Sequence, residues 1–91
     1  MKPRFTLDQH AEMGRTLAGL RDELAHRRTA LLNAYPRSGP EAAPARHLAD
    51  AIEAVDKARS ALEDLHYAET PDIASTGTYW PQAENRATIG H

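Results

Sequence analysis

The stretch TLDQHAEMGRTLAGLRDELAHRRTALLNA, residues 6–34, decides the fold. Thr6 and Gln9 match a capping box, in which the threonine side chain caps the amide three residues on and the glutamine reaches back. Large side chains then recur at alternating spacings of three and four, the a/d pattern of a helix that packs along a seam. The expected core positions are Leu17, Leu20, Leu24 and Leu31. The pattern predicts a helix over residues 7–34, preceded by an arm, residues 1–6.

A second seam follows a short break at residues 35–40. Pro36-Arg37-Ser38-Gly39-Pro40 is turn chemistry, and so short a connection favours an antiparallel neighbour. The second helix, residues 41–69, begins between Glu41 and Ala45 and ends before Pro71. Its seam positions are Leu48, Ala51, Val55, Ala58, Leu62 and Leu65, with Ile52 beside them. We therefore expect an all-α protein whose body, residues 7–69, is a coiled-coil-like antiparallel two-helix hairpin.

Alanine rows flank both seams at intervals of seven residues. They are Ala11, Ala18, Ala25 and Leu32 on the first helix and Ala54, Ala61 and Ala68 on the second. Alanine favours helix but buries little surface, so these rows widen the apolar face beyond what two helices cover. The rows predict a homodimer that completes a four-helix bundle, with cover by the C-terminal tail as the alternative.

Composition and charge narrow the function classes. There is no cysteine among the 91 residues, which excludes disulfides and thiolate chemistry. No apolar stretch approaches a membrane span, and the basic start lacks the apolar core of a signal peptide, so we expect a cytoplasmic protein. Formal charge is +3 over residues 1–40 and −5 over residues 41–91. The excess of alanine and of arginine over lysine is typical of a GC-rich genome and suits a small bacterial or phage protein.

Residues 70–91 form a polar tail without helical period. The tail contains Tyr79-Trp80-Pro81 and, in Trp80, the only tryptophan of the chain. Tryptophan is typical of binding anchors. Two interpretations stay open: the tail folds back and Trp80 plugs the open end or the alanine-lined flank of the hairpin, or Tyr79 and Trp80 are presented to a partner protein.

Three histidine pairings are candidates for chemistry. Glu63 and His66 form a Glu-x-x-His pair of the kind that builds di-iron sites in bundles, but the seam places Glu63 on the solvent side and His66 on the margin. Asp22 and His26 are also expected to be a solvated pair. His10, near the open end of the hairpin, is expected to meet Glu69 or the tail, and a pH-sensitive contact there is the sharper alternative. The sequence predicts no metal and no cofactor.

Arginines gather on the first helix at Arg15, Arg21, Arg27 and Arg28. The stem of Arg27 is expected to lie along the core. The arginines are expected to pair with Glu53 or Asp56 of the same chain, or with the copies of these residues across a dimer. A partner contact is the other interpretation. The candidate partner-binding residues are therefore Tyr79, Trp80, Arg21, Arg27 and Arg28. Negative net charge and the absence of interleaved aromatics make nucleic acid an unlikely ligand.

These observations favour a non-enzymatic protein–protein interaction or adaptor module. It would self-associate through the leucine and alanine seams and engage a partner through the tail or the basic face. The alternative is an antitoxin-like or transcription-associated regulator acting near nucleic acid. A metal-binding helical-bundle enzyme is the least favoured reading, because the five glycines make no phosphate loop and no carboxylates converge.

Overall fold

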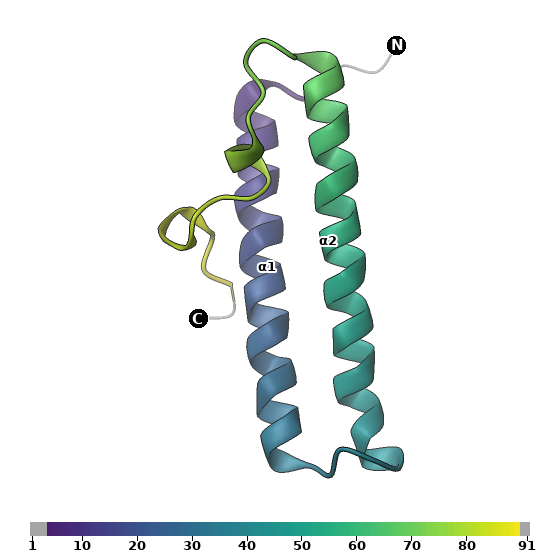
Figure 1. Ribbon diagram of the computed structural model, residues 1–91. Helices are drawn as coiled ribbons and strands as arrows, with labels where there is room; N and C mark the ends of the chain where they lie inside the picture. The colour runs from purple at the N-terminus through teal and green to yellow at the C-terminus, as the bar shows by residue number, and fades with distance from the viewer. Residues whose placement is uncertain (1–3, 90–91) are drawn as a thin grey trace.

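The computed structural model describes residues 4–89 and shows an antiparallel helical hairpin. Helix α1 spans Leu7–Ala34, a 3-10 turn η1 spans Pro40–Ala42, and helix α2 spans Ala43–Glu69 (Figure 1). The long axis of the molecule measures 49 Å. No strand occurs in the described part of the chain, so the predicted all-α hairpin is confirmed.

Local chemistry sets the ends of the helices. The Thr6 hydroxyl accepts from the Gln9 amide at 3.1 Å, and the Thr6 amide donates to Gln9 Oε1 at 2.8 Å, so the predicted capping box is present. In the loop, Gly39 adopts a φ of +78°, which glycine reaches without a Cβ clash. Pro40 then opens η1, and α2 begins at Ala43 with Pro44 in its first turn, where proline is tolerated.

The tail docks on its own chain. After α2 it passes through two 3-10 turns, η2 at Thr76–Thr78 and η3 at Ala83–Asn85, and descends beside α1 to about half its length (Figure 1). The tail folds back, as in the first of the two interpretations, but the fully buried side chain is Tyr79, whereas Trp80 is intermediate in exposure. We call residues 4–26 and 56–89 the tail-covered half and residues 27–55 the open half. The open half lies at the loop end of the hairpin, opposite the end where His10 and Glu69 meet. In this half the two helices and their loop pack only against each other, without the tail.

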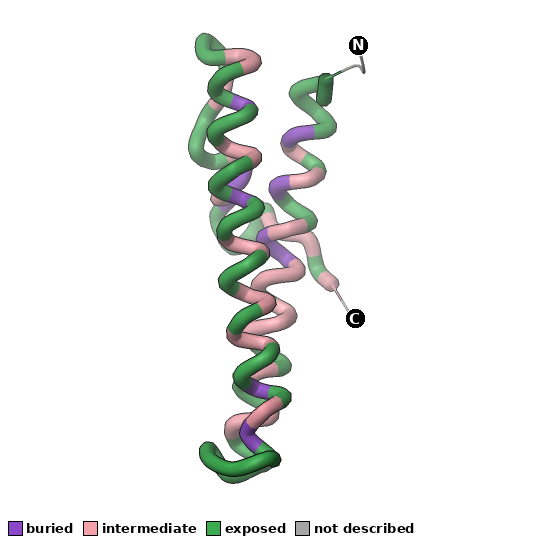
Figure 2. Tube along the Cα trace, turned by 90° about the vertical axis from the view of Figure 1, so that its right-hand side faces the viewer, coloured by how far each residue is buried: buried purple, intermediate pink, exposed green. Residues whose placement is uncertain are grey.

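The best-buried large side chains are polar. The four that are less than 2% exposed are Arg59, Tyr79, His10 and His66. Figure 2 shows buried positions scattered singly among exposed and intermediate ones. The leucines of both predicted seams are intermediate, apart from Leu65, which is 50% exposed. Two helices that touch along a single line cover only one side of each apolar side chain. The other sides stay accessible to solvent, so the seam leucines are only partly buried.

The buried register of α2 differs from the predicted one. Ala45, Arg59 and His66 are buried at intervals that are multiples of seven, whereas Ala58 is exposed. The expectation that His66 lies on the margin of the seam is therefore wrong. For Arg59 and His66 the cause is the tail, which covers the flank of α2 that carries them and which a two-helix seam does not include. Ala45 is buried in the open half, away from the tail.

Neither helix is long and apolar enough to cross a membrane, within residues 4–89.

Candidate functional site

The tail lies on α1 at two glycines. A Cβ on Gly14 would come within 1.8 Å of the carbonyl oxygen of Thr78, and one on Gly19 within 2.0 Å of the carbonyl oxygen of Ala87. The Ala87 amide also donates to the backbone oxygen of Arg15 at 3.1 Å. Glycine tolerates a close backbone approach because it has no side chain. These two positions therefore make the surface of α1 flat enough for the tail backbone to rest on.

Arg59 on α2 holds the tail from the other side. Its Nε donates to the Tyr79 carbonyl at 3.0 Å, and its Nη1 donates to Asp56 Oδ1 at 3.1 Å. The guanidinium carbon lies 3.9 Å from the centroid of the Trp80 ring. A planar cation can stack on an indole and donate in its own plane at the same time. One buried side chain thus binds the tail backbone and a tail ring together.

Two more polar contacts fix the tail on either side of Pro81. The Trp80 Nε1 donates to Glu63 Oε2 at 2.7 Å. Arg86 donates through Nε to the Pro81 carbonyl at 2.9 Å and through Nη1 to Asp22 Oδ1 at 2.7 Å. Glu63 therefore does not belong to a solvated Glu-x-x-His pair, contrary to the sequence expectation. Its carboxylate accepts a hydrogen bond from Trp80 of the tail. The periodicity of α2 gives no information about this contact.

His10 joins the tail to the end of α2. Its Nδ1 lies 2.5 Å from Tyr79 Oη, and its Nε2 lies 3.0 Å from Glu69 Oε1. The expectation that His10 meets Glu69 or the tail is confirmed for both. Burial, and secondly the charge of Glu69, raises the pKa of Tyr79, so its hydroxyl remains a donor. The hydroxyl donates to Nδ1, and Nε2–H donates to the carboxylate.

His66 lies against His10 and under the tail. The two imidazole centroids are 4.4 Å apart, and the Tyr79 ring stands edge-on to both. The Thr70 hydroxyl donates to the His66 carbonyl at 3.1 Å, and its oxygen lies 3.3 Å from His66 Nδ1. The other ring nitrogen, Nε2, is buried and has no hydrogen-bond partner. Burial first, and then His10, lowers the pKa of His66, against an opposing effect of Glu69.

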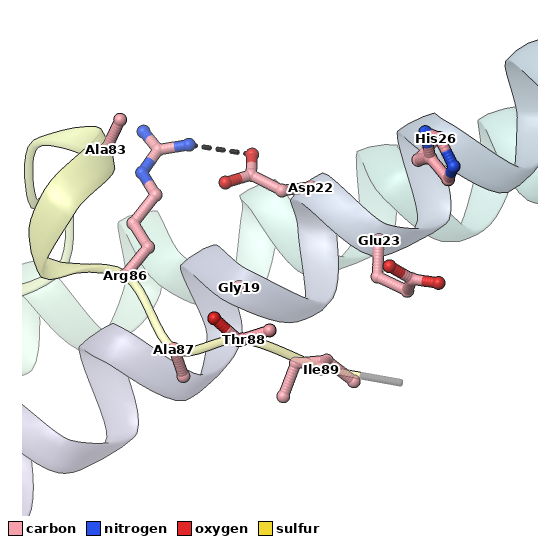
Figure 3. A pocket seen from close by; sticks show the side chains of 9 residues that line it. All are labelled: Gly19, Asp22, Glu23, His26, Ala83, Arg86, Ala87, Thr88 and Ile89. Carbon is pink, nitrogen blue, oxygen red and sulfur yellow. Dashed lines mark hydrogen bonds and ion pairs between the residues drawn. The ribbon is translucent and has the colours of Figure 1, made fainter. Parts of the chain in front are cut away.

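A shallow pocket lies where the tail ends against α1 (Figure 3). Asp22 points to Arg86 and is bonded to it, so it does not pair with His26. His26 is exposed. Glu23 lies on a different side of the helix and accepts from Arg27 Nε at 2.7 Å. Within residues 4–89, no three histidine or acidic side chains gather where they could hold a metal ion.

The arginine strip is divided among different partners. Arg21 Nε lies 3.7 Å from Asp56 Oδ2, which matches the expected pairing across the hairpin. The Arg27 side chain is 62% exposed beside Glu23, so the expected position along the core is wrong for this residue. The next residue, Arg28, is the more buried of the two arginines. Its Nε is shielded from water and has no hydrogen-bond partner.

The open half has no well-buried large side chain. Its only buried residues are Ala42 and Ala45, within the described chain. Its leucine, isoleucine and valine residues are all intermediate in exposure, and Tyr35 is 50% exposed: the intermediate ones are Leu31, Leu32, Leu48, Ile52 and Val55. In the tail-covered half, Leu17, Leu20, Leu24 and Leu62 are intermediate too, and Leu65 lines a small hollow with Phe5.

Sequence reasoning missed Gly14, Gly19 and Arg59. A glycine inside a strong helical pattern costs about 1 kcal/mol relative to alanine, which is a signal of close packing. Arg59 gave a weaker signal. It lies seven residues from both Ile52 and His66, but only the position of the tail reveals that this row of α2 contains buried residues. The candidate residues Tyr79 and Trp80 contact the helices of their own chain, and Tyr79 is fully buried there.

Comparison with protein-family models, with curated proteins and with solved structures gives no significant match to this chain.

Proposed function

We propose that the protein is a non-enzymatic interaction module that self-associates through its open half. The observation that carries this proposal is the incomplete burial of Leu31, Leu48 and Ile52, where only two helices are present. Burying a leucine-sized side chain fully stabilises by about 1.5–3 kcal/mol relative to exposure. A second hairpin laid on the open half would cover these side chains, a part of the molecule that the tail does not reach.

Charge favours a second copy as the occupant. The basic surplus lies in residues 1–40 and the acidic surplus in residues 41–91. A two-fold arrangement in which α1 of one copy lies beside α2 of the other would bring opposite charges together in both contacts. The Arg21–Asp56 pair already joins the two helices in this sense within one chain.

The buried histidine cluster supports a structural role. Tyr79, His10 and Glu69 form a hydrogen-bonded chain, but the tyrosine is 0% and the histidine 2% exposed. General acid–base catalysis needs a group within hydrogen-bond reach of its substrate. A substrate would reach this chain only after the tail had left, and the tail contributes the tyrosine itself.

Molar mass in solution tests the proposal. Light scattering behind size exclusion should give a dimer for the natural chain, and Leu31→Asp should shift it to monomer because it places a charge in the apolar contact. Asn33→Asp is the matched control, since it adds the same charge at an exposed position two residues on. Helix content by circular dichroism separates dissociation from unfolding. A monomer over the whole micromolar range, with full helicity, would refute the proposal.

A further inference from the structure

We infer that the tail is a pH-sensitive latch, which His66 holds closed when neutral and opens when protonated. The inference does not depend on the oligomeric state. It rests on the buried cluster where α1, α2 and the tail meet. His66 is fully buried there, and the Tyr79 ring of the tail stands edge-on to both imidazoles.

The hydrogen bonds leave His66 no place for a second proton. The Thr70 hydroxyl donates to the His66 carbonyl, so its oxygen accepts from Nδ1–H, and Nε2 is the unprotonated nitrogen. A proton on Nε2 would be a buried donor without an acceptor, because that atom has no partner. Its charge would also lie against the His10 ring, whose centroid is 4.4 Å away.

The surrounding charges do not rescue this proton. From α1, His10 faces the imidazole, and from the tail, the neutral hydroxyl of Tyr79 does. On α2, Tyr67 is neutral, and Glu69 is the one carboxylate that favours the charged form. Both Glu69 oxygens are already engaged, one by His10 Nε2 at 3.0 Å and the other by Arg4 Nε at 3.6 Å. Water is the remaining acceptor, and it enters when the tail leaves.

The direction of the pH effect follows from the lowered pKa. Well above pH 6.5, the ordinary pKa of a histidine, His66 is neutral in both states and the latch has its full strength. Below pH 6.5, the released state binds a proton that the docked state disfavours, so the latch weakens as the pH falls. One proton changes the docking equilibrium by at most about tenfold per pH unit.

Trp80 reports the state of the latch, because it is the only tryptophan and stacks on Arg59. The test is a titration of the full chain from pH 8 to pH 5.5, with indole emission and acrylamide quenching as readouts and helix content followed in parallel. We expect Trp80 to become quenchable below pH 6.5 while α1 and α2 persist. Quenching that stays constant across this range overturns the inference.

Substitutions test whether His66 causes the pH dependence of tail docking. His66→Gln should remove the pH dependence, and His47→Gln, at an exposed position of α2, should retain it. A transition that survives in His66→Gln overturns the inference. Should His66→Gln leave the tail undocked at pH 8, the natural chain decides by NMR: the His66 ring signals and the indole signal must titrate together. A His66 ring that titrates while the indole signal stays unchanged overturns the latch.

Discussion

The two halves of the hairpin solve the same packing problem with opposite chemistry. In the tail-covered half, three polar side chains are buried, and two of them, His10 and Arg59, bond directly to Tyr79 of the tail; the third is His66. In the open half, apolar side chains such as Ile52 remain partly accessible and make no directed contact. Polar groups require a partner of fixed geometry, which the tail of the same chain provides. Apolar groups accept any complementary surface, which suits association with a second copy.

A substitution that prevents the tail from docking on α1 should have the largest effect on the exposure of Trp80. Gly14→Ala places a Cβ where the Thr78 carbonyl now lies, and backbone cannot yield as a flexible side chain does. We expect Trp80 to become fully quenchable, although alanine stabilises the helix itself by about 1 kcal/mol. Gly77→Ala is the control, because its nearest neighbour would be at an ordinary 3.5 Å. A Gly14→Ala chain with a docked tail would show that the fit on α1 is not tight.

Arg59→Lys should weaken the tail-covered half next. Lysine cannot stack on Trp80 and donate in the same plane to the Tyr79 carbonyl, so a buried acceptor loses its bond. We expect a loss of about 1–3 kcal/mol in the free energy of unfolding, measured by urea denaturation. The loss should be the same at low and high protein concentration. A stability equal to that of the natural chain would mean that charge alone holds the tail.

Ile52→Ala should distinguish the two halves, because its loss of stability should depend on the protein concentration. The lost methylenes cost about 1–2 kcal/mol in a half-buried site, and more once a second copy covers it. The urea midpoint should therefore fall further at high than at low protein concentration. Leu17→Ala, in the tail-covered half, is the matched substitution, and its cost should not vary with concentration. Equal behaviour of the two variants would contradict the assignment of the halves.

Glu53→Gln should have the smallest effect. Its pair with Lys57 at 3.3 Å joins side chains that are 67% and 76% exposed. Exposed pairs four residues apart contribute about 0.3–0.5 kcal/mol. We expect the thermal midpoint of the monomeric state to change little. A large drop would show that this pair contributes more to the hairpin itself than an exposed pair ordinarily does.

The sequence predicted the helices well and the tail poorly, for a physical reason. The capping box at Thr6 and the proline-glycine break are local signals, so they placed both helices. The position of the tail depends on contacts such as Tyr79 with His10, which are 69 residues apart and leave no periodic trace. The buried status of His66 follows from the tail, so the helical pattern alone assigned it to the margin. Arg27 and Arg28 differ by one position, which is within the uncertainty of a heptad assignment.

Hydrogen exchange of the full chain at two protein concentrations tests the central claim most directly. The account predicts that amides of residues 27–55 become more protected as the concentration rises, because a second copy covers them. Amides of residues 7–26 and 56–69 should exchange at rates that do not depend on concentration, because the chain's own tail covers them. Protection that is independent of concentration throughout, or that rises only in the tail-covered half, would contradict the account.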